Sequence, residues 1–537
     1  MSHRKCSHNR HTVPTVNRGY GDAGASTTKR ALKGFTAQSG SPQEDIDFNN
    51  YTLRQRSRML YMASPIATAA LKRQRTAIVG GGLKLKCAID REALGMTQEQ
   101  AEAWQKKTQA EFEMWASKKQ ACDATGLNNF YGLQQLVMLT YPMSGDVFAL
   151  FKRYDTTPLM PYSLRIQLIE ADRVRTPRDK VILAPFCTTG KASNGNTIYD
   201  GVEVDGNGAV VAYHIANSYP QTFNPDIVTE FTRVEAYGKK TGLPNILHIM
   251  DSERPDQYRG VPYLAQVIEP LLQMRRYTEA EIMAAVVQSF YTAFITSNES
   301  ASDMPFNEVG GDGSAEVSRD PNDYEMGAGT INMLEPGEDV RFATPTHPNT
   351  GFDVFMKSLC EQVGAALEIP TDLLMMSFNS SYSASRAALM EAWRAFRMRR
   401  EWLTDDFCRP VYEVWLTEAI ARGRIKANGF FTDPAIRAAY LGANWIGAPQ
   451  GMLDPTKELS AAKMAIEEGF TTRSAEAIKL NGSEYSANVA QLATENRMLS
   501  EANSALSVAT EAAPQTVPET VEDETDPDDE NNKNEEE

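Results

Sequence analysis

The residue types that most often carry out chemistry are present in this chain, but their spacing does not define a catalytic site. Asp251, Glu253 and Asp256 cluster beside Arg254 and Arg259. Three carboxylates of this kind could hold the ions of a two-metal nuclease site. A salt-bridged surface loop is the alternative, and it is favoured because runs of charged residues are usually solvated. The cluster therefore makes no positive case for hydrolysis.

The motifs that bind phosphate or activate a nucleophile are missing. A Walker loop has the pattern GxxxxGK followed by Ser or Thr, which lets backbone amides hold phosphates. The nearest candidate, Gly190-Lys191, is followed by Ala192 and lacks the upstream glycine, and no GxSxG, HExxH or GxGxxG pattern occurs. His214, His248 and His347 are far apart, so each is expected to be a structural or surface histidine rather than a base. We expect no catalytic residue and no cofactor.

A metal site is not expected either. The segment around His3, Cys6, His8 and His11 is too polar to hold these side chains in a fixed coordination geometry. The cysteines form no CxxC pair, which argues against a zinc ribbon and against a disulfide framework. They are Cys6, Cys87, Cys122, Cys187, Cys360 and Cys408.

Composition is that of an ordinary soluble protein, but the charge is unevenly spread. The chain has 537 residues and a net charge of −16; residues 1–40 hold seven Lys and Arg against one Asp, and residues 519–537 hold eleven acids against one Lys. An acidic protein does not bind polyanions tightly, although it could contact DNA loosely. No stretch approaches the roughly 18 apolar residues of a membrane span, and no signal-peptide core is present. We expect a protein assembled from the cytoplasm, with no membrane association.

The body of the chain begins with a basic helix. The apolar spacing predicts one helix from about Tyr51 to Ile78, ending at Gly80-Gly81-Gly82. Its basic residues could contact nucleic acid, or they could form a solvated or intersubunit face. The second interpretation is favoured because no aromatic stacking platform accompanies the charge. These residues are Arg54, Arg56, Arg58, Lys72, Arg73 and Arg75.

A mixed helical and β region is expected up to residue 260. Thr97 and Gln100 form a capping-box pattern that predicts the start of a second helix, and a third is expected over roughly 130–141. Asp205-Gly206-Asn207-Gly208 is typical of a hairpin turn. The β-prone segments are 146–154, 164–169, 198–204 and 209–216.

The second half of the chain is expected to be mainly helical. One helix is predicted after Pro270 and another from about Phe352 to Leu367. A polar loop at 377–382 precedes the helix that is expected to be the longest, with Ser383 as its cap and Pro410 as a kink. A Gly- and Ser-rich stretch, two short β segments and two small helices complete this half. They are 297–329, 330–334 and 340–343, and 456–468 and 472–480, respectively.

A series of short segments follows a fixed order along residues 50–490. They are Arg56-Ser57-Arg58, Ser64-Pro65-Ile66-Ala67, Val79-Gly80-Gly81-Gly82, Leu168-Ile169-Glu170-Ala171-Asp172-Arg173, Gly201-Val202-Glu203-Val204-Asp205, Ala212-Tyr213-His214, Leu247-His248-Ile249, Glu253-Arg254-Pro255-Asp256-Gln257-Tyr258-Arg259-Gly260-Val261-Pro262, Ser381-Tyr382-Ser383-Ala384-Ser385-Arg386-Ala387 and Asn444-Trp445-Ile446-Gly447. No single segment is decisive, but their colinear order resembles the lambda family of bacteriophage portal proteins.

The resemblance implies an α+β portal fold with a wing, a helical stem, a small β-containing clip, a long helical spine and a helical crown. A disordered basic arm and a disordered acidic tail would flank it. The implied divisions are 1–45 for the arm, 46–260 for the wing, 261–294 and 351–370 for the stem helices, 295–350 for the clip, 371–385 for the tunnel loop, 386–454 for the wing spine and following segment, 455–511 for the crown and 512–537 for the tail.

The resemblance also implies a structural protein that forms a ring, expected to be a dodecamer, at one capsid vertex. Viral DNA would pass through the ring during packaging and ejection. The implied partners are further copies of the chain, loosely bound double-stranded DNA, the terminase large subunit, a head-completion or tail adaptor protein, and a major capsid or scaffold protein. A metal-dependent nuclease, a terminase-type motor component and a scaffold that forms no ring remain alternatives, although the missing Walker loop argues against the motor.

Two polar surfaces are expected to line the implied channel, with ordinary solvated surface as the alternative for both. A channel must let a polyanion slide, so strong phosphate clamps would hinder it. Ser, Asn and Tyr side chains contact DNA without fixing its register. The tunnel-loop candidates are Asn379, Ser380, Ser381, Tyr382, Ser383 and Arg386, and the stem-face candidates are Asp353, Lys357, Glu361 and Glu368.

Overall fold

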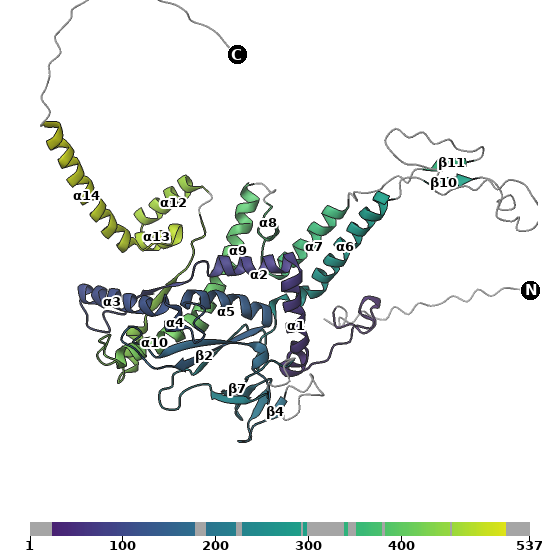
Figure 1. The fold of residues 1–537 in the computed structure, drawn as a ribbon, viewed down its shortest axis with the longest axis horizontal. Coiled ribbons are helices and arrows are strands. Elements are labelled where there is room, and N and C mark those ends of the chain that lie inside the picture. The colour runs from purple at the N-terminus through teal and green to yellow at the C-terminus, as the bar shows by residue number, and fades with distance from the viewer. Residues whose placement is uncertain are drawn as a thin grey trace, which may run out of the picture.

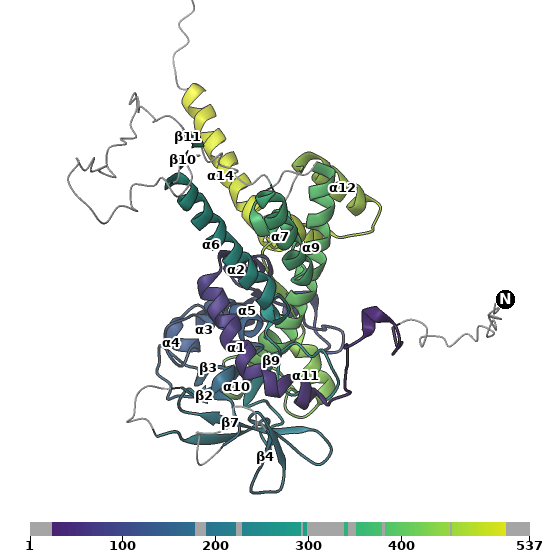
Figure 2. The same ribbon diagram turned by 90° about the vertical axis from the view of Figure 1, so that its right-hand side faces the viewer.

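In the computed structural model, helices packed on antiparallel sheets form a body from which other helices project (Figures 1 and 2). Two of the projecting helices, α6 (Ile268–Phe290) and α7 (Phe352–Ala366), lie side by side. The combination of helices with antiparallel sheets confirms the predicted α+β class. The structure describes residues 24–177, 189–221, 228–290, 294–297, 338–341, 351–377, 382–451 and 454–511.

Two antiparallel sheets share an apolar core at the base of the body. Phe148, on the central strand of the smaller sheet, is fully buried against Tyr213 of the larger sheet, with their ring centroids 5.5 Å apart. The smaller sheet has the order β3-β2-β9 and the larger one the order β4-β5-β6-β7-β8. The strands are β2 (Asp146–Arg153), β3 (Leu164–Glu170), β4 (Thr189–Lys191), β5 (Thr197–Tyr199), β6 (Val202–Val204), β7 (Val210–Ala216), β8 (Phe231–Glu235) and β9 (Ile246–Met250).

The hairpin turn at residues 205–208 is confirmed, but the preceding strand is divided. Asp205 Oδ1 accepts hydrogen bonds from the backbone amides of Asn207 and Ala209, at 2.8 and 2.9 Å. The predicted single strand 198–204 is instead the two strands β5 and β6. Gly201, at φ 87°, reverses the chain between them, and a Cβ there would lie 2.4 Å from the Arg175 nitrogen. Only glycine fits this turn.

The predicted single helix over 51–78 is two helices, α1 (Phe48–Ala63) and α2 (Pro65–Ile78). Pro65 disfavours the helical conformation at Ser64, which is extended at φ −109° and ψ 116°. Ser64 instead caps the second helix by accepting a hydrogen bond from the Ala67 amide. The break lets α1 lie beside α6 while α2 crosses above the body (Figure 1).

Aromatic side chains fill the main core above the smaller sheet. Phe112 of α3 (Gln98–Ala116) lies edge-on to Trp415 of α10 (Arg409–Ala421), with centroids 5.0 Å apart. The capping box predicted at Thr97 and Gln100 is present and starts α3. Phe130 begins α5 (Phe130–Ser144), which extends three residues beyond the predicted end.

The helix predicted to be the longest is shorter than the final one. α9 (Tyr382–Leu403) has 22 residues and continues through a π-helical turn, Thr404–Cys408, into α10, where Pro410 lies in the first turn. α14 (Tyr485–Glu511) has 27 residues and had no specific prediction. The other elements are α4 (Lys119–Cys122), α8 (Thr371–Met375), α11 (Pro434–Leu441), α12 (Pro455–Glu467), α13 (Arg473–Asn481), β1 (Lys84–Cys87), β10 (Phe294–Ser297), β11 (Glu338–Arg341) and β12 (Ala443–Ile446).

Two short sheets join segments that are distant in the sequence. β1 pairs with β12, and β10 pairs with β11, which overlaps the predicted segment 340–343. The predicted segment 330–334 lies outside the described residues. Among the described helices, none is long and apolar enough to cross a membrane.

The arm predicted over residues 1–45 ends earlier than expected. Arg254 donates hydrogen bonds to the Gly40 carbonyl, at 3.0 Å, and to the Asp45 carboxylate. Gln43 donates to the Asp256 carbonyl. Residues 40–45 therefore lie against the body, whereas residues 1–23 and the predicted tail from 512 are outside the described part of the chain.

Candidate functional site

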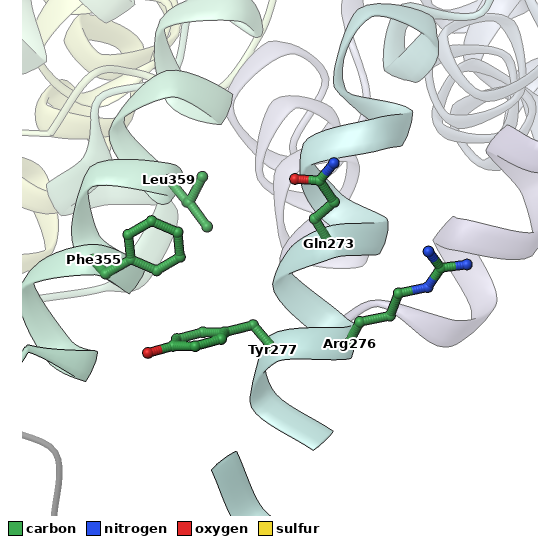
Figure 3. A pocket seen from close by; sticks show the side chains of 5 residues that line it. All are labelled: Gln273, Arg276, Tyr277, Phe355 and Leu359. Carbon is green, nitrogen blue, oxygen red and sulfur yellow. The ribbon is translucent and has the colours of Figure 1, made fainter. Parts of the chain in front are cut away.

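Helix α7 carries most of the stem-face residues that the sequence predicted to line a channel, and it packs against α6. The ring of Tyr277 on α6 stacks on Phe352 of α7, with centroids 5.5 Å apart, and lies edge-on to Phe355 at 5.1 Å. These aromatic contacts hold the two helices together. An open groove of about 430 Å³ lies between them, and Figure 3 shows its lining. The lining residues are Gln273, Arg276, Tyr277, Phe355 and Leu359.

Three of the four stem-face candidates share one exposed side of α7. Asp353, Lys357 and Glu361 follow each other at i+4 spacing, and all three are exposed. A face with two acids and one base has alternating charge, which gives weak contact with a polyanion rather than a clamp. The predicted arrangement of these three residues is therefore present in the helix.

The predicted placement of Glu368 on that helix face is wrong. α7 ends at Ala366, and Glu368 follows it with a left-handed φ of 53°. Its carboxylate accepts a hydrogen bond of 2.9 Å from Arg399 of α9. Arg399 is nearly fully buried and lies over the Tyr263 ring, 4.2 Å from the centroid. Glu368 thus connects the end of α7 to α9.

The tunnel-loop candidates fall partly outside the described residues. Asn379, Ser380 and Ser381 are among those that the structure does not describe. Tyr382 and Ser383 are the first two residues of α9. The prediction that Ser383 precedes the helix as its cap is therefore wrong. Arg386 is half-exposed in the first turns of α9. The predicted loop is also shorter than 371–385, because its first five residues form α8.

The carboxylate cluster that raised the nuclease alternative does not converge. Among the described residues, no group of three His, Cys, Asp or Glu side chains could hold a metal ion. Asp251 is half-buried, and burial raises its pKa, whereas Glu253 and Asp256 are exposed. Arg254 pairs with Asp45 and Arg259 points into the interior, so the interpretation as a salt-bridged loop holds for Arg254 alone.

Arg259 is the centre of a buried ion-pair cluster. Its guanidinium donates to both carboxylate oxygens of Asp146, at 2.6 and 3.1 Å, and to Asp200 at 2.7 Å. It also donates to the carbonyls of Val174 and Ala171, at 2.8 and 2.9 Å. The side chain is fully buried, and these bonds satisfy a charge that would otherwise be too costly to bury.

The same cluster binds α1 to the sheets. Burial raises the pKa of Asp146, but the Arg259 and Arg54 guanidinium groups outweigh burial and hold that pKa well below its usual value. Arg54 of α1 lies 3.3 Å from Asp200, and Arg58 pairs with Asp172. The cluster is therefore Arg54, Arg58, Asp146, Asp172, Asp200 and Arg259, drawn from α1, from the start of β2, from the segments that follow β3 and β5, and from the loop after β9.

Sequence reasoning did not identify this cluster. Arg54 was predicted to contact nucleic acid or to lie on a solvated or intersubunit face, and it does neither in the described chain, because it is almost fully buried. A sequence signal was present, since Arg54 and Ser57 fall at the i+3 spacing of the buried Leu60. An arginine on the apolar side of a helix indicates a buried carboxylate partner.

The two described histidines confirm the structural interpretation. His214 Nε2 lies 3.0 Å from Glu203, and His248 Nε2 lies 3.3 Å from Asp146. Burial lowers the pKa of both imidazoles. His248 also stacks on Phe148, with centroids 4.2 Å apart. His347 lies outside the described residues.

The chain matches the model of one protein family, described as phage portal protein, lambda family, over residues 28–400. It is 24% identical over 481 residues to portal protein B of Escherichia phage lambda, covering 85% of this chain and 87% of that relative. It is 23% identical over 483 residues to the portal protein of Escherichia phage N15, covering 87% of each. A probable portal protein of Halomonas phage phiHAP-1 is 24% identical over 457 residues, 84% of this chain and 82% of the relative.

Solved structures with a similar chain include the neck of a native gene transfer agent particle, computed with C12 symmetry. That chain is 13% identical, with a TM-score of 0.39, and the alignment covers 81% of this chain and 94% of the other. A chain from the neck of the empty particle, computed with C6 symmetry, is 14% identical with a TM-score of 0.38 and the same coverage.

Proposed function

Because the chain belongs to the lambda family of phage portal proteins, we propose that it assembles into a ring, expected to be a dodecamer, at one capsid vertex. Viral DNA passes through this ring during packaging and ejection. The observation that carries the proposal is the family match over residues 28–400, which includes the two larger sheets of the body and both paired helices. The family is structural, and the chain acts without catalysis of its own. It is assembled in the host cytoplasm and resides at the portal vertex of the virion.

The elements divide according to the family architecture. The sheet-containing body is the wing, α6 and α7 are the stem, and the segment between them, 295–350, is the clip. The loop around residues 378–381 is the tunnel loop, α9 is the spine, and α12 to α14 form the crown. The pairing of β10 with β11 supports the clip assignment, because a short two-stranded sheet leaves edges that a neighbouring copy can extend.

The stem face and the tunnel loop contact DNA in the channel. Asp353, Lys357 and Glu361 present mixed charge, which favours sliding over retention. Arg386 adds one cation near the loop, and the serines and asparagine of the loop add neutral polar contacts. Glu368 contributes indirectly, because its ion pair with Arg399 fixes the end of the stem against the spine.

The partners follow from this position in the particle. The terminase large subunit docks at the ring during packaging, and a head-completion or tail adaptor protein takes its place afterwards. The wing contacts the major capsid protein or a scaffold protein. These partners distinguish the proposal from a nuclease or motor component, and electron microscopy of the purified chain tests it directly. A ring with an axial hole and no metal-dependent DNA cleavage or ATP hydrolysis is expected; cleavage that disappears with Asp251→Asn would overturn it.

The channel assignment has a sharper test in the loop. Changing Asn379, Ser380 and Ser381 together to Lys adds three cations per copy, which should leave ring assembly intact and make DNA stick in the channel. Each phosphate contact adds to the salt dependence of binding, so packaging should stall most severely at low salt.

A control with the same added charge separates position from charge. Gln98, Gln120 and Asn207 are exposed on the body, and changing all three to Lys should leave packaging unchanged. Packaging at the normal rate by the loop variant at every salt concentration would exclude the loop from the channel. Failure of the loop variant alone to form rings would give the loop a structural role instead.

A further inference from the structure

Arg399 of α9 is a buried cation that uses few of its hydrogen-bond donors. Its side chain is 6% exposed. Within the described chain only Nη2 donates, to the Glu368 carboxylate at 2.9 Å and to the Tyr263 hydroxyl. Nε and Nη1 are buried and have no partner among the described residues. Because a buried donor without a partner costs free energy, these two nitrogens favour a second acceptor.

The present partner, Glu368, is held in an unfavourable backbone conformation. Its φ is 53°, in the left-handed region that residues other than glycine seldom adopt. The neighbours Leu367 and Ile369 are almost fully buried, and the Leu367 carbonyl accepts a hydrogen bond of 3.1 Å from Gln74 of α2. These contacts fix the backbone on both sides of Glu368, whose own side chain is 52% exposed. The ion pair therefore joins a buried cation to a strained and exposed anion.

A second carboxylate, that of Asp251, lies near Arg399 without pairing with it. Asp251 follows β9 and is half-buried. Burial raises its pKa, the charge of Arg399 acts in the opposite direction, and Glu253 and Glu368 raise that pKa further. Among the described residues Asp251 forms no ion pair and accepts no side-chain hydrogen bond. Asp251 and Arg399 are thus two buried or half-buried groups of opposite charge that each have unused hydrogen-bonding capacity.

The surroundings of Asp251 also favour a cationic partner. Asp406 lies in the π-helical turn between α9 and α10, which contacts β9. Burial, followed by the charge of Asp251, raises the pKa of Asp406 to about 6. A guanidinium paired with Asp251 would offset the repulsion between these two acids. Tyr141 and Tyr263, which also face Arg399, stay neutral because burial raises the pKa of both hydroxyls.

We propose that Arg399 exchanges Glu368 for Asp251, so that its guanidinium pairs with one carboxylate or with the other. In the present structure it pairs with Glu368, which joins the end of α7 to α9. In the second state Nε and Nη1 donate to Asp251 beyond the end of β9, and Glu368 is free to leave its left-handed conformation. The buried cation has a carboxylate partner in both states, so the exchange avoids the cost of an unpaired charge.

The exchange acts at the joint between the proposed stem and the proposed spine. Loss of the Glu368 pair removes a charged link between α7 and α9, while the apolar contacts of Val363 and Leu367 with the body remain. The joint then has two discrete arrangements, as a conformational switch requires. All three charged residues belong to one chain, so the exchange does not depend on the proposed ring.

A double-mutant cycle on the full chain tests the exchange. Because either carboxylate can neutralise Arg399, Asp251→Asn and Glu368→Gln should each change the unfolding equilibrium by less than about fivefold. The double variant should change it at least about tenfold more than the product of the two single changes, because the buried guanidinium then has no carboxylate. A double variant that fails to fold, while both single variants fold, would also support the exchange.

Glu253 provides the matched control for this cycle. It is an exposed acid whose charge also acts on Asp251. Glu253→Gln combined with Glu368→Gln should match the product of its single changes within about twofold. A product within the same limit for Asp251→Asn with Glu368→Gln would overturn the exchange, as would equal non-additivity in both cycles.

The pH dependence of unfolding shows whether Asp251 itself becomes the partner. In the natural protein its raised pKa makes protonation stabilising, so its contribution falls as the pH rises above about 4. In Glu368→Gln, pairing with Arg399 lowers that pKa, so the contribution rises up to about pH 4 and then stays constant. Subtracting the curve of the corresponding Asp251→Asn variant isolates the contribution in each background.

The outcomes separate this inference from the proposed function. A contribution of Asp251 that still falls above about pH 4 in Glu368→Gln would overturn the exchange and leave the ring proposal intact. The absence of rings in electron microscopy would overturn the ring proposal alone. Strong non-additivity together with the reversed pH dependence would establish the exchange.

Discussion

Replacing Arg259 with Met should destabilise the body more than any other single change at a charged residue of the described chain. The guanidinium is fully buried and donates to Asp146 and Asp200. Methionine fills a similar volume but leaves two carboxylates without their main partner. Breaking a buried ion pair in this way costs about 3–5 kcal/mol.

The remaining cluster reduces this cost without removing it. Arg54 lies 3.9 Å from Asp146 and His248 lies 3.3 Å away, so the carboxylate keeps part of its stabilisation. We therefore expect the lower end of the range, about 3 kcal/mol in the free energy of unfolding. That corresponds to a change of more than a hundredfold in the unfolding equilibrium. Equilibrium urea unfolding, followed by tryptophan fluorescence, measures it.

Two variants show whether the hydrogen bonds of the buried Arg259 guanidinium account for this loss of stability. Arg259→Lys keeps the charge but cannot donate to Asp146 and Asp200 at once, so it should fall between the natural protein and Arg259→Met. Arg275→Met removes an exposed i,i+4 pair with Glu279 on α6 and should cost under about 1 kcal/mol. An unfolding free energy for Arg259→Met within about 0.5 kcal/mol of the Arg275→Met value would refute the reasoning.

Three further predictions use other features of the chain. Burial, with nearby Asp200, raises the pKa of Asp47 to about 7. Its protonation therefore stabilises the folded state fully below about pH 4, and this contribution is lost as the pH rises through 7. Asp47→Asn should abolish the decline in thermal stability that is measured from pH 5 to 8. Hydrogen bonds from Arg233 lower the pKa of Glu203 to about 2, so the contribution of Glu203 to stability is present above pH 4.5 and is lost as the pH falls toward 2. Glu203→Gln should lower the free energy of unfolding by about 2 kcal/mol at pH 7 and make acid unfolding less steep. Equal acid unfolding profiles of the variant and the natural protein would contradict this. A chain of residues 46–511 should form rings seen by electron microscopy, because the Arg254–Asp45 pair that it loses is half-exposed; monomers where the full chain forms rings would refute it.

Features fixed by neighbouring residues were predicted well from the sequence. The capping box at Thr97 and the turn at 205–208 depend on side chains within four residues, and both are present. The break at Ser64 was also a local signal, because a residue before proline is disfavoured in a helix. The apolar periodicity continued across the break and concealed it.

Features that depend on distant partners could not be predicted. β1 pairs with β12 some 360 positions away, and nothing in either segment specifies the other. The same holds for Arg54, whose burial depends on Asp200 and Asp146, and for Glu368, whose partner Arg399 lies on the next long helix. The sequence shows which residues carry a charge, but only the fold shows which residues of opposite charge lie next to them.

The position of the buried cluster explains what kind of information the family resemblance carries. Three of the segments that define it, those containing Arg58, Asp172 and Arg259, meet at this cluster in the interior of the body. These residues stabilise the fold through buried ion pairs. The resemblance is therefore strong evidence for architecture. It also implies the channel, but the choice of Asp353, Lys357, Glu361 and the loop after α8 as DNA contacts depends in addition on physical reasoning about a sliding polyanion. Arg259→Met therefore tests the role of the buried cluster in the fold, and the lysine variant of the loop tests the assignment of the loop to the channel. A loop variant that folds normally and packages DNA unimpeded would refute only the channel assignment.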